Sequence, residues 1–241
     1  MNEEPFRSID KLYATKQDTV EAFEFNASVA RVFTDMVNRS VPGYNLIVDM
    51  ISILAMHHAE AIDRPLHCVD YGCSRGAVTQ ALAKRLTHLA TRFTLLDSSQ
   101  SMIDAAKDEI DDARATFCVA DILEAQVDQT DIAVMNLVLQ FIEPSRRLEL
   151  LASVHDTLAE DGMLILTEKI EAGPEFVDFH LAFKRAAGYS DLEIKQKRDA
   201  LEKVMVIDSL TKHKQRLRAA GFRRVNVWFR LLNWVSFLAR P

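Results

Sequence analysis

The sequence has few cysteines and lacks any long apolar run, and both shortages limit where the protein works. Cys68, Cys73 and Cys118 cannot all pair, and each lies in or beside a segment typical of a buried strand, so we expect reduced thiols. No uninterrupted apolar run reaches the length of a membrane span, and residues 1–5 lack the basic and apolar regions of a signal peptide. We therefore expect a cytoplasmic protein without a membrane partner.

A metal-binding pattern is missing as well. His67 stands close to Cys68 and Cys73, but no second pair of ligands follows downstream, so we expect no metal site. Internal repeats and low-complexity segments are also lacking. The 241 residues are 49% hydrophobic with a mean hydropathy of −0.03, which is typical of a globular protein and favours one large α/β domain over two small ones.

An overall excess of basic charge is absent too. The net charge of −6 argues against a protein that binds nucleic acid with its whole surface. From Lys195 to the end, however, Lys and Arg far outnumber the acids, which are Asp199, Glu202 and Asp208. Solvated helix faces are the favoured interpretation, and a surface for RNA or an anionic substrate is the alternative. We expect no direct contact with nucleic acid.

The most informative stretch that is present runs from His67 to Ala77. It reads as a buried strand, a turn bracketed by Gly72 and Gly76, and a helix. Glycine at these two positions lets the backbone approach a ligand closely, because no Cβ intervenes. The turn therefore indicates a nucleoside site, although glycines placed only for turn geometry remain the alternative at this point.

Two kinds of nucleotide turn compete here. A dinucleotide turn requires G-x-G-x-x-G, and its second and third glycine positions hold Ser74 and Ala77, which is a poor match. The D-x-G-x-x-x-G turn of S-adenosylmethionine enzymes is matched by Asp70, Gly72 and Gly76. This second turn favours S-adenosylmethionine over a dinucleotide.

Polar residues also follow the next three expected strands. Asp97 ends the strand 92–97, and its carboxylate is suited to accept hydrogen bonds from both ribose hydroxyls. Asp121 and Ile122 follow the third strand, where an acceptor and an apolar wall would hold adenine, and Asn136 ends the fourth. Each acid alone is more often a turn residue or a helix cap, but strand ends in register favour one binding crevice.

These observations predict an α/β fold: a doubly wound Rossmann-like methyltransferase sheet with an antiparallel last strand. Helix-spaced apolar residues precede the first strand and would cover the crevice, which makes Tyr44 a lid residue. Gly162 is expected to close the helix before the fifth strand at 163–168, and one long helical segment is expected at 175–205. The predicted parts of this single domain, 1–241, are a poorly ordered arm (1–19), lid helices (20–62), a nucleoside-binding core (63–170), a helical insertion (171–212) and C-terminal strands (213–241).

Four stretches resemble those of the carboxy-S-adenosyl-L-methionine synthases, a family in the class I S-adenosylmethionine-dependent methyltransferase superfamily. They are residues 72–77, 39–44, 139–144 and 183–205, and the resemblance extends from about Phe25 to the C-terminus. It implies a reaction in which prephenate carboxylates the methyl group of S-adenosylmethionine by carboxyl capture at a sulfonium ylide and phenylpyruvate is released. The product, carboxy-S-adenosylmethionine, would serve 5-carboxymethoxy modification of the tRNA wobble uridine.

The resemblance also implies site residues and an assembly. Arg198 would pair with the added carboxylate, in agreement with the argument that an inward arginine beside a sulfonium predicts an anionic group. A homodimer is implied by analogy. Ser98 stands where the family leads us to expect Asn, and Arg75 where the family can carry an apolar residue. The implied cofactor-binding set is Tyr44, Gly72, Cys73, Ser74, Asp97, Ser98, Asp121, Ile122, Asn136 and Arg198.

Two other functions stay open from the sequence. A methyltransferase acting on a small molecule or RNA would need a general base, for which His180 and Tyr189 are candidates, although structural roles are favoured for both. A noncatalytic nucleoside-binding subunit is the third reading, and no residue favours it.

Overall fold

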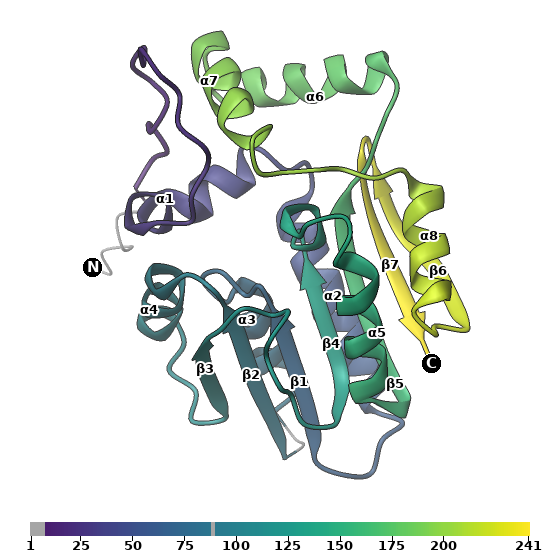
Figure 1. The fold of residues 1–241 in the computed structure, drawn as a ribbon. Coiled ribbons are helices and arrows are strands. Elements are labelled where there is room, and N and C mark those ends of the chain that lie inside the picture. Colours follow the sequence, from purple (N-terminus) through teal and green to yellow (C-terminus); the bar gives the residue numbers. More distant parts are fainter. Residues whose placement is uncertain (1–7, 88–89) are drawn as a thin grey trace.

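A single seven-stranded sheet organises the chain, and a computed structural model describes residues 8–87 and 90–241 of it (Figure 1). The strand order is β3-β2-β1-β4-β5-β7-β6. The strands are β1 (Leu66–Tyr71), β2 (Thr91–Asp97), β3 (Ala115–Val119), β4 (Thr130–Asn136), β5 (Leu158–Lys169), β6 (Arg224–Leu231) and β7 (Trp234–Arg240). The helices are α1 (Ala27–Asn38), α2 (Tyr44–Ala59), α3 (Ala77–Arg85), α4 (Gln100–Glu109), α5 (Arg147–Thr157), α6 (Pro174–Ala186), α7 (Asp191–Leu201) and α8 (Leu210–Ala219), with a 3-10 turn η1 (Leu139–Phe141).

The first five strands run parallel, and the last pair turns back. β7 lies antiparallel to both β5 and β6, as predicted for the last strand. Apolar side chains cover both faces: α5 and α8 pack on one face, and α2 and α3 pack on the other. The doubly wound methyltransferase-like sheet predicted from the sequence is confirmed. Because parallel strands share a direction, the carboxyl ends of β1, β2, β4 and β5 meet at one edge.

A helical layer lies over this edge. Figure 1 shows α6 and α7 above the carboxyl ends of the strands, with α1 beside them. The long segment predicted at 175–205 is divided, because Gly188 adopts φ +89° and ends α6 before α7 begins. Ser190 and Glu193 then form a capping box at the start of α7. The break lets the two helices point in different directions over the sheet.

The predicted end of the helix before β5 is also corrected. α5 ends at Thr157, whose hydroxyl donates to the Val154 carbonyl at 2.9 Å, and Gly162 lies inside β5. Leu158 already pairs with Thr130 of β4, with a register shift before the regular ladder resumes. Sheet pairing rather than glycine chemistry therefore fixes this helix end.

The N-terminal arm differs from the expectation of poor order. Residues 1–7 lie outside the described residues, but residues 8–19 contact α7 through Gln196. Its side-chain amide donates to the Tyr13 and Thr15 carbonyls at 3.0 and 2.9 Å and accepts from the Gln17 amide at 2.7 Å. Leu12 and Tyr13 of the arm also pack against the apolar cluster that includes residues of α1 and α7. These contacts come from single residues without a helical or strand period, which is why periodicity did not reveal the position of the arm.

Candidate active site

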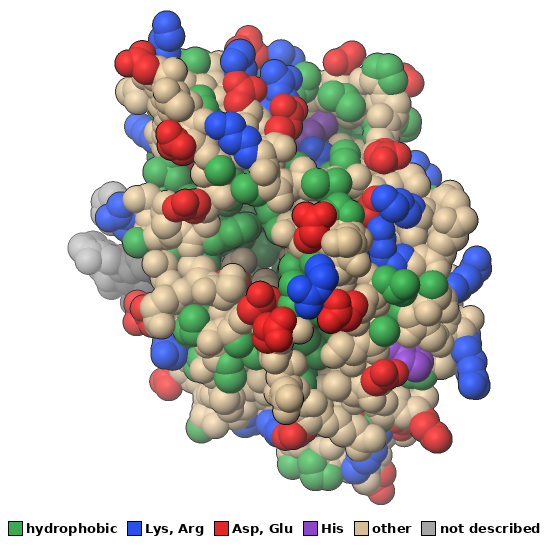
Figure 2. All heavy atoms as spheres, in the orientation of Figure 1, with side chains coloured by type: hydrophobic (Ala, Val, Ile, Leu, Met, Phe, Trp, Pro, Cys, Tyr) green, Lys and Arg blue, Asp and Glu red, His purple; other side chains and the backbone are tan. Residues whose placement is uncertain are grey.

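One cavity of about 420 Å³ lies between the sheet edge and the helical layer. Figure 2 shows the hollow on this face of the molecule, with hydrophobic side chains gathered around it. Its lining includes every residue of the predicted cofactor set except Arg198. These are Tyr44, Gly72, Cys73, Ser74, Asp97, Ser98, Asp121, Ile122 and Asn136.

The glycine turn after β1 forms part of the floor. Gly72 and Gly76 adopt φ +67° and +74°, a left-handed conformation that other residues adopt only with strain. A Cβ at Gly72 would stand 2.6 Å from a methyl carbon of Val138. Both the conformation and the neighbouring Val138 side chain therefore require glycine at position 72, which is a requirement of the turn and its packing within the chain. Close approach of the turn to a ligand stays a prediction.

Asp97 is fixed at the tip of β2 by two backbone amides. One carboxylate oxygen accepts from the Ser74 amide at 2.9 Å, and the other accepts from the Ser99 amide, also at 2.9 Å. Burial raises the pKa of this carboxyl, while the two amide hydrogen bonds act in the opposite direction. The carboxylate is thus oriented before any ligand arrives, and each oxygen keeps further acceptor capacity for a pair of hydroxyls.

A second buried carboxyl, Asp70, lies under the same turn. It accepts a hydrogen bond from the Thr79 hydroxyl at 2.8 Å, and burial raises its pKa to about 7. Tyr44 begins α2, and burial followed by the charge of Asp70 raises the pKa of its phenol. Tyr44 therefore lies on the cavity wall as a neutral phenol. The helix that it begins packs on a face of the sheet beside α3 and does not cover the crevice, so the expectation of a lid formed by both N-terminal helices is corrected for α2.

The loop after β4 is held by Glu168. Its carboxylate accepts from the amides of Val138, Leu139 and Gln140 at 3.1, 2.7 and 2.9 Å. Asn136, just before this loop, has a buried side-chain oxygen without a hydrogen-bond partner among the described residues. A buried acceptor without a donor is costly, so this oxygen is suited to receive a donor from a ligand.

The other end of the cavity is cationic. It is lined by Lys169 at the end of β5, His180 and Lys184 on α6, and Lys197 on α7. The His180 ring nitrogen Nε2 donates to the Ser40 carbonyl at 2.9 Å. Burial, with the charge of Lys184 next, lowers the pKa of His180 to about 3, so the imidazole is neutral near pH 7.

The cationic end was missed by sequence reasoning as a group. The sequence analysis names His180 only as a candidate base with a structural role favoured, and Lys184 falls only within the stretch 183–205 that resembles the synthases. The available signal was the spacing of four between His180 and Lys184, which places both on one helix face. The sequence does not determine whether that face turns inward.

Comparison with known proteins supports a methyltransferase fold. A methyltransferase-domain family model matches residues 68–162. An O-methyltransferase family protein from Burkholderia thailandensis superposes with a TM-score of 0.66 at 14% identity, over 92% of this chain and 65% of that chain. The plantazolicin methyltransferase BpumL, solved with a substrate analogue and SAH, gives a TM-score of 0.65 at 15% identity, over 86% and 88%. At such identities the likeness concerns the fold alone.

The relatives found by sequence share far more identical residues with this chain than these solved structures do. A carboxy-S-adenosyl-L-methionine synthase of Pseudomonas paraeruginosa is 42% identical over 247 aligned positions, covering 96% of each chain. One of Geobacter metallireducens is 40% identical over 240 positions, covering 95% of this chain and 97% of that one. This chain belongs to the carboxy-S-adenosyl-L-methionine synthase family. The family predicted from the residue stretches is confirmed.

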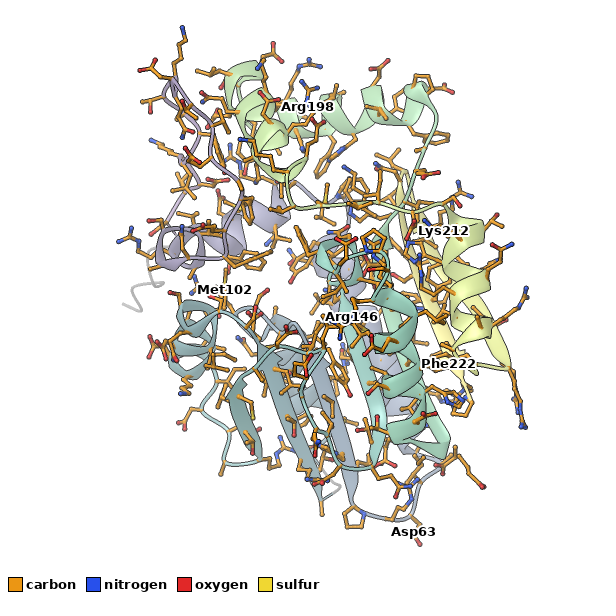
Figure 3. The ribbon with its side chains drawn as sticks, viewed as in Figure 1. Asp63, Met102, Arg146, Arg198, Lys212 and Phe222 are labelled. Atoms are coloured by element: carbon orange, nitrogen blue, oxygen red, sulfur yellow. The ribbon has the colours of Figure 1, made fainter. Side chains whose placement is uncertain are left out.

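Two residues singled out from the sequence lie away from the cavity lining: Arg198, from the resemblance to the synthases, and Tyr189, a candidate base for a methyltransferase. Arg198 lies on α7 in the helical layer, where Figure 3 labels it, with 51% of its side chain exposed and Glu202 at 3.7 Å. The Tyr189 hydroxyl donates to the buried Asp10 carboxylate. Tyr189 therefore has a structural contact, whereas the placement of Arg198 does not by itself support contact with a ligand.

Arg75, which with Ser98 departs from the pattern of the synthases, points away from the site. Its guanidinium donates to the Ala30 carbonyl of α1 and pairs with Glu109 of α4. The residue therefore ties the glycine turn to two helices, and an apolar residue at this position would remove the tie without touching the cavity.

Two classes of feature are absent among the described residues. No group of three or more His, Cys, Asp or Glu side chains there is arranged to hold a metal ion. Within the same ranges, 8–87 and 90–241, no helix has the length and apolar character needed to cross a membrane.

Proposed function

We propose that this chain converts S-adenosylmethionine and prephenate into carboxy-S-adenosylmethionine and phenylpyruvate. The observation that carries the proposal is one cavity with a nucleoside-type end and a buried cationic end. Prephenate is a dianion, so cations at the second end suit it. The membership of the chain in the synthase family supports the same reaction.

The residues of the sheet edge fit the nucleoside. Asp97 would accept from both ribose hydroxyls, Asp121 and Ile122 would hold the adenine, and the free oxygen of Asn136 would accept from the amino group. The bound nucleoside supplies a sulfonium methyl group as the carboxyl acceptor. Gly72 lines the cavity, so the backbone of its turn would lie against the bound nucleoside.

The overall reaction balances within these two reactants. The donor loses its ring carboxyl group and its ring hydroxyl, its ring becomes aromatic, and one new bond joins the carboxyl carbon to the methyl carbon. The proton lost from the methyl group combines with the hydroxyl to form water. The chain's contribution is to orient the two reactants and to exclude solvent, for which the apolar centre of the cavity, including Phe25, Phe141 and Ile142, is suited.

The role of Arg198 as the partner of the added carboxylate is part of this proposal. Pairing with the added carboxylate requires its guanidinium to leave the surface position beside Glu202 and enter the cavity. The proposed homodimer would use the helical insertion, where Phe176, Phe179 and Leu192 are exposed. The product would leave this cytoplasmic enzyme for a separate tRNA-modifying step, with no nucleic acid bound here.

Mass spectrometry of the nucleoside released from the denatured, purified protein tests the reaction. We expect carboxy-S-adenosylmethionine, formed in greater amount when prephenate is added, and a smaller amount from Arg198→Ala. Release of plain S-adenosylmethionine or its demethylated product, unaffected by prephenate and by Arg198→Ala, would contradict carboxylation and leave an ordinary methyltransferase.

A further inference from the structure

The cations at the far end of the cavity differ in whether they already have partners. Lys197 is paired: its ammonium lies 3.3 Å from the Asp10 carboxylate, 3.0 Å from the Ser40 hydroxyl and 3.2 Å from the Tyr189 hydroxyl. This set ties the N-terminal arm to α7. The charge of Lys197 is therefore already compensated within the chain.

Lys184 and Lys169 are not compensated in this way. Lys184 on α6 is only 8% exposed, and Lys169 at the end of β5 lies with its ammonium 5.8 Å from the centre of the Trp234 ring. Within residues 8–87 and 90–241, neither ammonium has an acidic partner or a hydrogen-bond acceptor in range. Both line the cavity, so an anion bound there would meet two unpaired ammonium groups.

The surroundings of Lys184 add to this cost. Burial, then the charges of Lys169, Lys197 and Arg198, lowers the pKa of Lys184 to about 7. Burial also lowers the pKa of Lys169, while the charge of Glu202, which is too distant to form an ion pair, acts in the opposite direction. His180, the other titratable neighbour on α6, is neutral and contributes no charge to offset them. An anionic ligand would restore the protonated form of Lys184.

We propose that Lys184 and Lys169 form the subsite for the keto-acid carboxylate of the carboxyl donor. This inference rests on the proposed function, which gives the donor two carboxylates. The carboxylate to be transferred must lose its charge as its carbon bond breaks, so a lysine on it would stabilise the reactant more than the transition state. The lysines therefore take the carboxylate that stays, and the departing one lies toward the nucleoside, against apolar side chains such as Phe141.

The product phenylpyruvate is the sharpest probe, because it keeps the keto-acid carboxylate and lacks the transferred one. Its dissociation constant is measured by calorimetry with S-adenosylhomocysteine present, beside the neutral analogue phenylacetone. We expect Lys184→Met and Lys169→Met each to weaken phenylpyruvate binding at least about tenfold. Phenylacetone binding and S-adenosylhomocysteine binding stay unchanged, and Lys184→Arg keeps most of the phenylpyruvate affinity.

Lys195→Met is the matched control, since Lys195 lies on α7 with its side chain 66% exposed and paired with Asp199. It should bind phenylpyruvate as the wild type does. A second readout is proton uptake on phenylpyruvate binding at pH 8, obtained from binding enthalpies in buffers of different ionisation enthalpy. The wild type takes up protons, and Lys184→Met takes up fewer, which a merely structural role of the lysine would not produce.

Three outcomes would contradict either the lysine subsite or the proposed carboxyl donor. Unchanged phenylpyruvate affinity in both Met variants, with a wild type that makes carboxy-S-adenosylmethionine from prephenate, overturns the subsite alone. Loss of S-adenosylhomocysteine binding together with phenylpyruvate binding in both variants also overturns it, because the lysines would then be structural. A wild type that binds neither prephenate nor phenylpyruvate, and makes no product, contradicts the proposed donor.

Discussion

The two ends of the cavity are built differently. At the nucleoside end, polar side chains stand on strand ends and are already bonded to backbone amides, as Asp97 is to Ser74 and Ser99. At the other end, Lys184 is buried and Lys169 is partly buried, and neither has an acidic partner among the described residues. The ends of the strands and their backbone amides therefore orient the side chains of the nucleoside end, which we call the prepared end, before a ligand binds. The second end carries unfavourable positive charge that either a bound anion or deprotonation of Lys184 relieves, so its affinity for a ligand should depend on ligand charge and on pH.

The largest effect is expected at the prepared end, from Asp97→Asn. The amide keeps one acceptor and turns its NH₂ group toward a backbone donor, so both the internal contacts and the ribose contacts suffer. Binding of S-adenosylhomocysteine should weaken about 100-fold or more by calorimetry. Asp108→Asn, on the exposed face of α4, is the control. A change of threefold or less in Asp97→Asn would show that this carboxylate is not a ligand.

The backbone of the prepared end is tested by Gly72→Ala. The left-handed conformation and the overlap with Val138 should together lower the free energy of unfolding by about 2–4 kcal/mol in chemical denaturation. Adding Val138→Ala should recover part of the loss, measured as coupling in a double-mutant cycle. Gly173→Ala, where a Cβ meets nothing within 4 Å, should change little. Equal costs at positions 72 and 173 would refute the close-approach account.

The charged end is tested through the pH dependence of stability. The pKa of Lys184 is about 7 in the folded chain, below its ordinary value of 10.5, so between these pH values the unfolded chain binds more protons. Stability from this group therefore rises with pH across that window. Lys184→Met should be more stable than the wild type at pH 7, by about 1–3 kcal/mol, and the difference should shrink toward pH 10. Parallel pH profiles in denaturant unfolding would count against an uncompensated lysine.

The smallest effect is expected outside both ends. Lys214 and Arg218 lie on α8, and no residue of α8 lines the cavity. Lys214→Glu and Arg218→Glu should leave turnover of the two small substrates within twofold, in a coupled assay of phenylpyruvate release. A large loss would mean that the basic C-terminal third takes part in substrate capture.

The difference between the ends also explains what the sequence could predict. The nucleoside end follows from local chemistry. Glycine stands where φ is positive, Asp97 ends one parallel strand and Asp121 follows another, and the carboxyl ends of parallel strands must meet at one edge of the sheet. The lysine end depends on how α6 and α7 lie across the sheet, which the break at Gly188 decides. Two adjacent residues illustrate the limit: Lys197 faces the cavity, while Arg198, the predicted one, faces outward. The sequence of a basic segment does not determine which of its side chains faces the cavity.

The most direct test of the whole account follows the carboxyl carbon. The protein is incubated with S-adenosylmethionine and prephenate labelled with carbon-13 in the ring carboxyl, and the nucleosides are separated and weighed by mass spectrometry. The account predicts labelled carboxy-S-adenosylmethionine and an equal amount of unlabelled phenylpyruvate, with both products reduced together in Lys184→Met. Unlabelled nucleoside from the wild type, despite bound S-adenosylmethionine and intact prephenate, would contradict it.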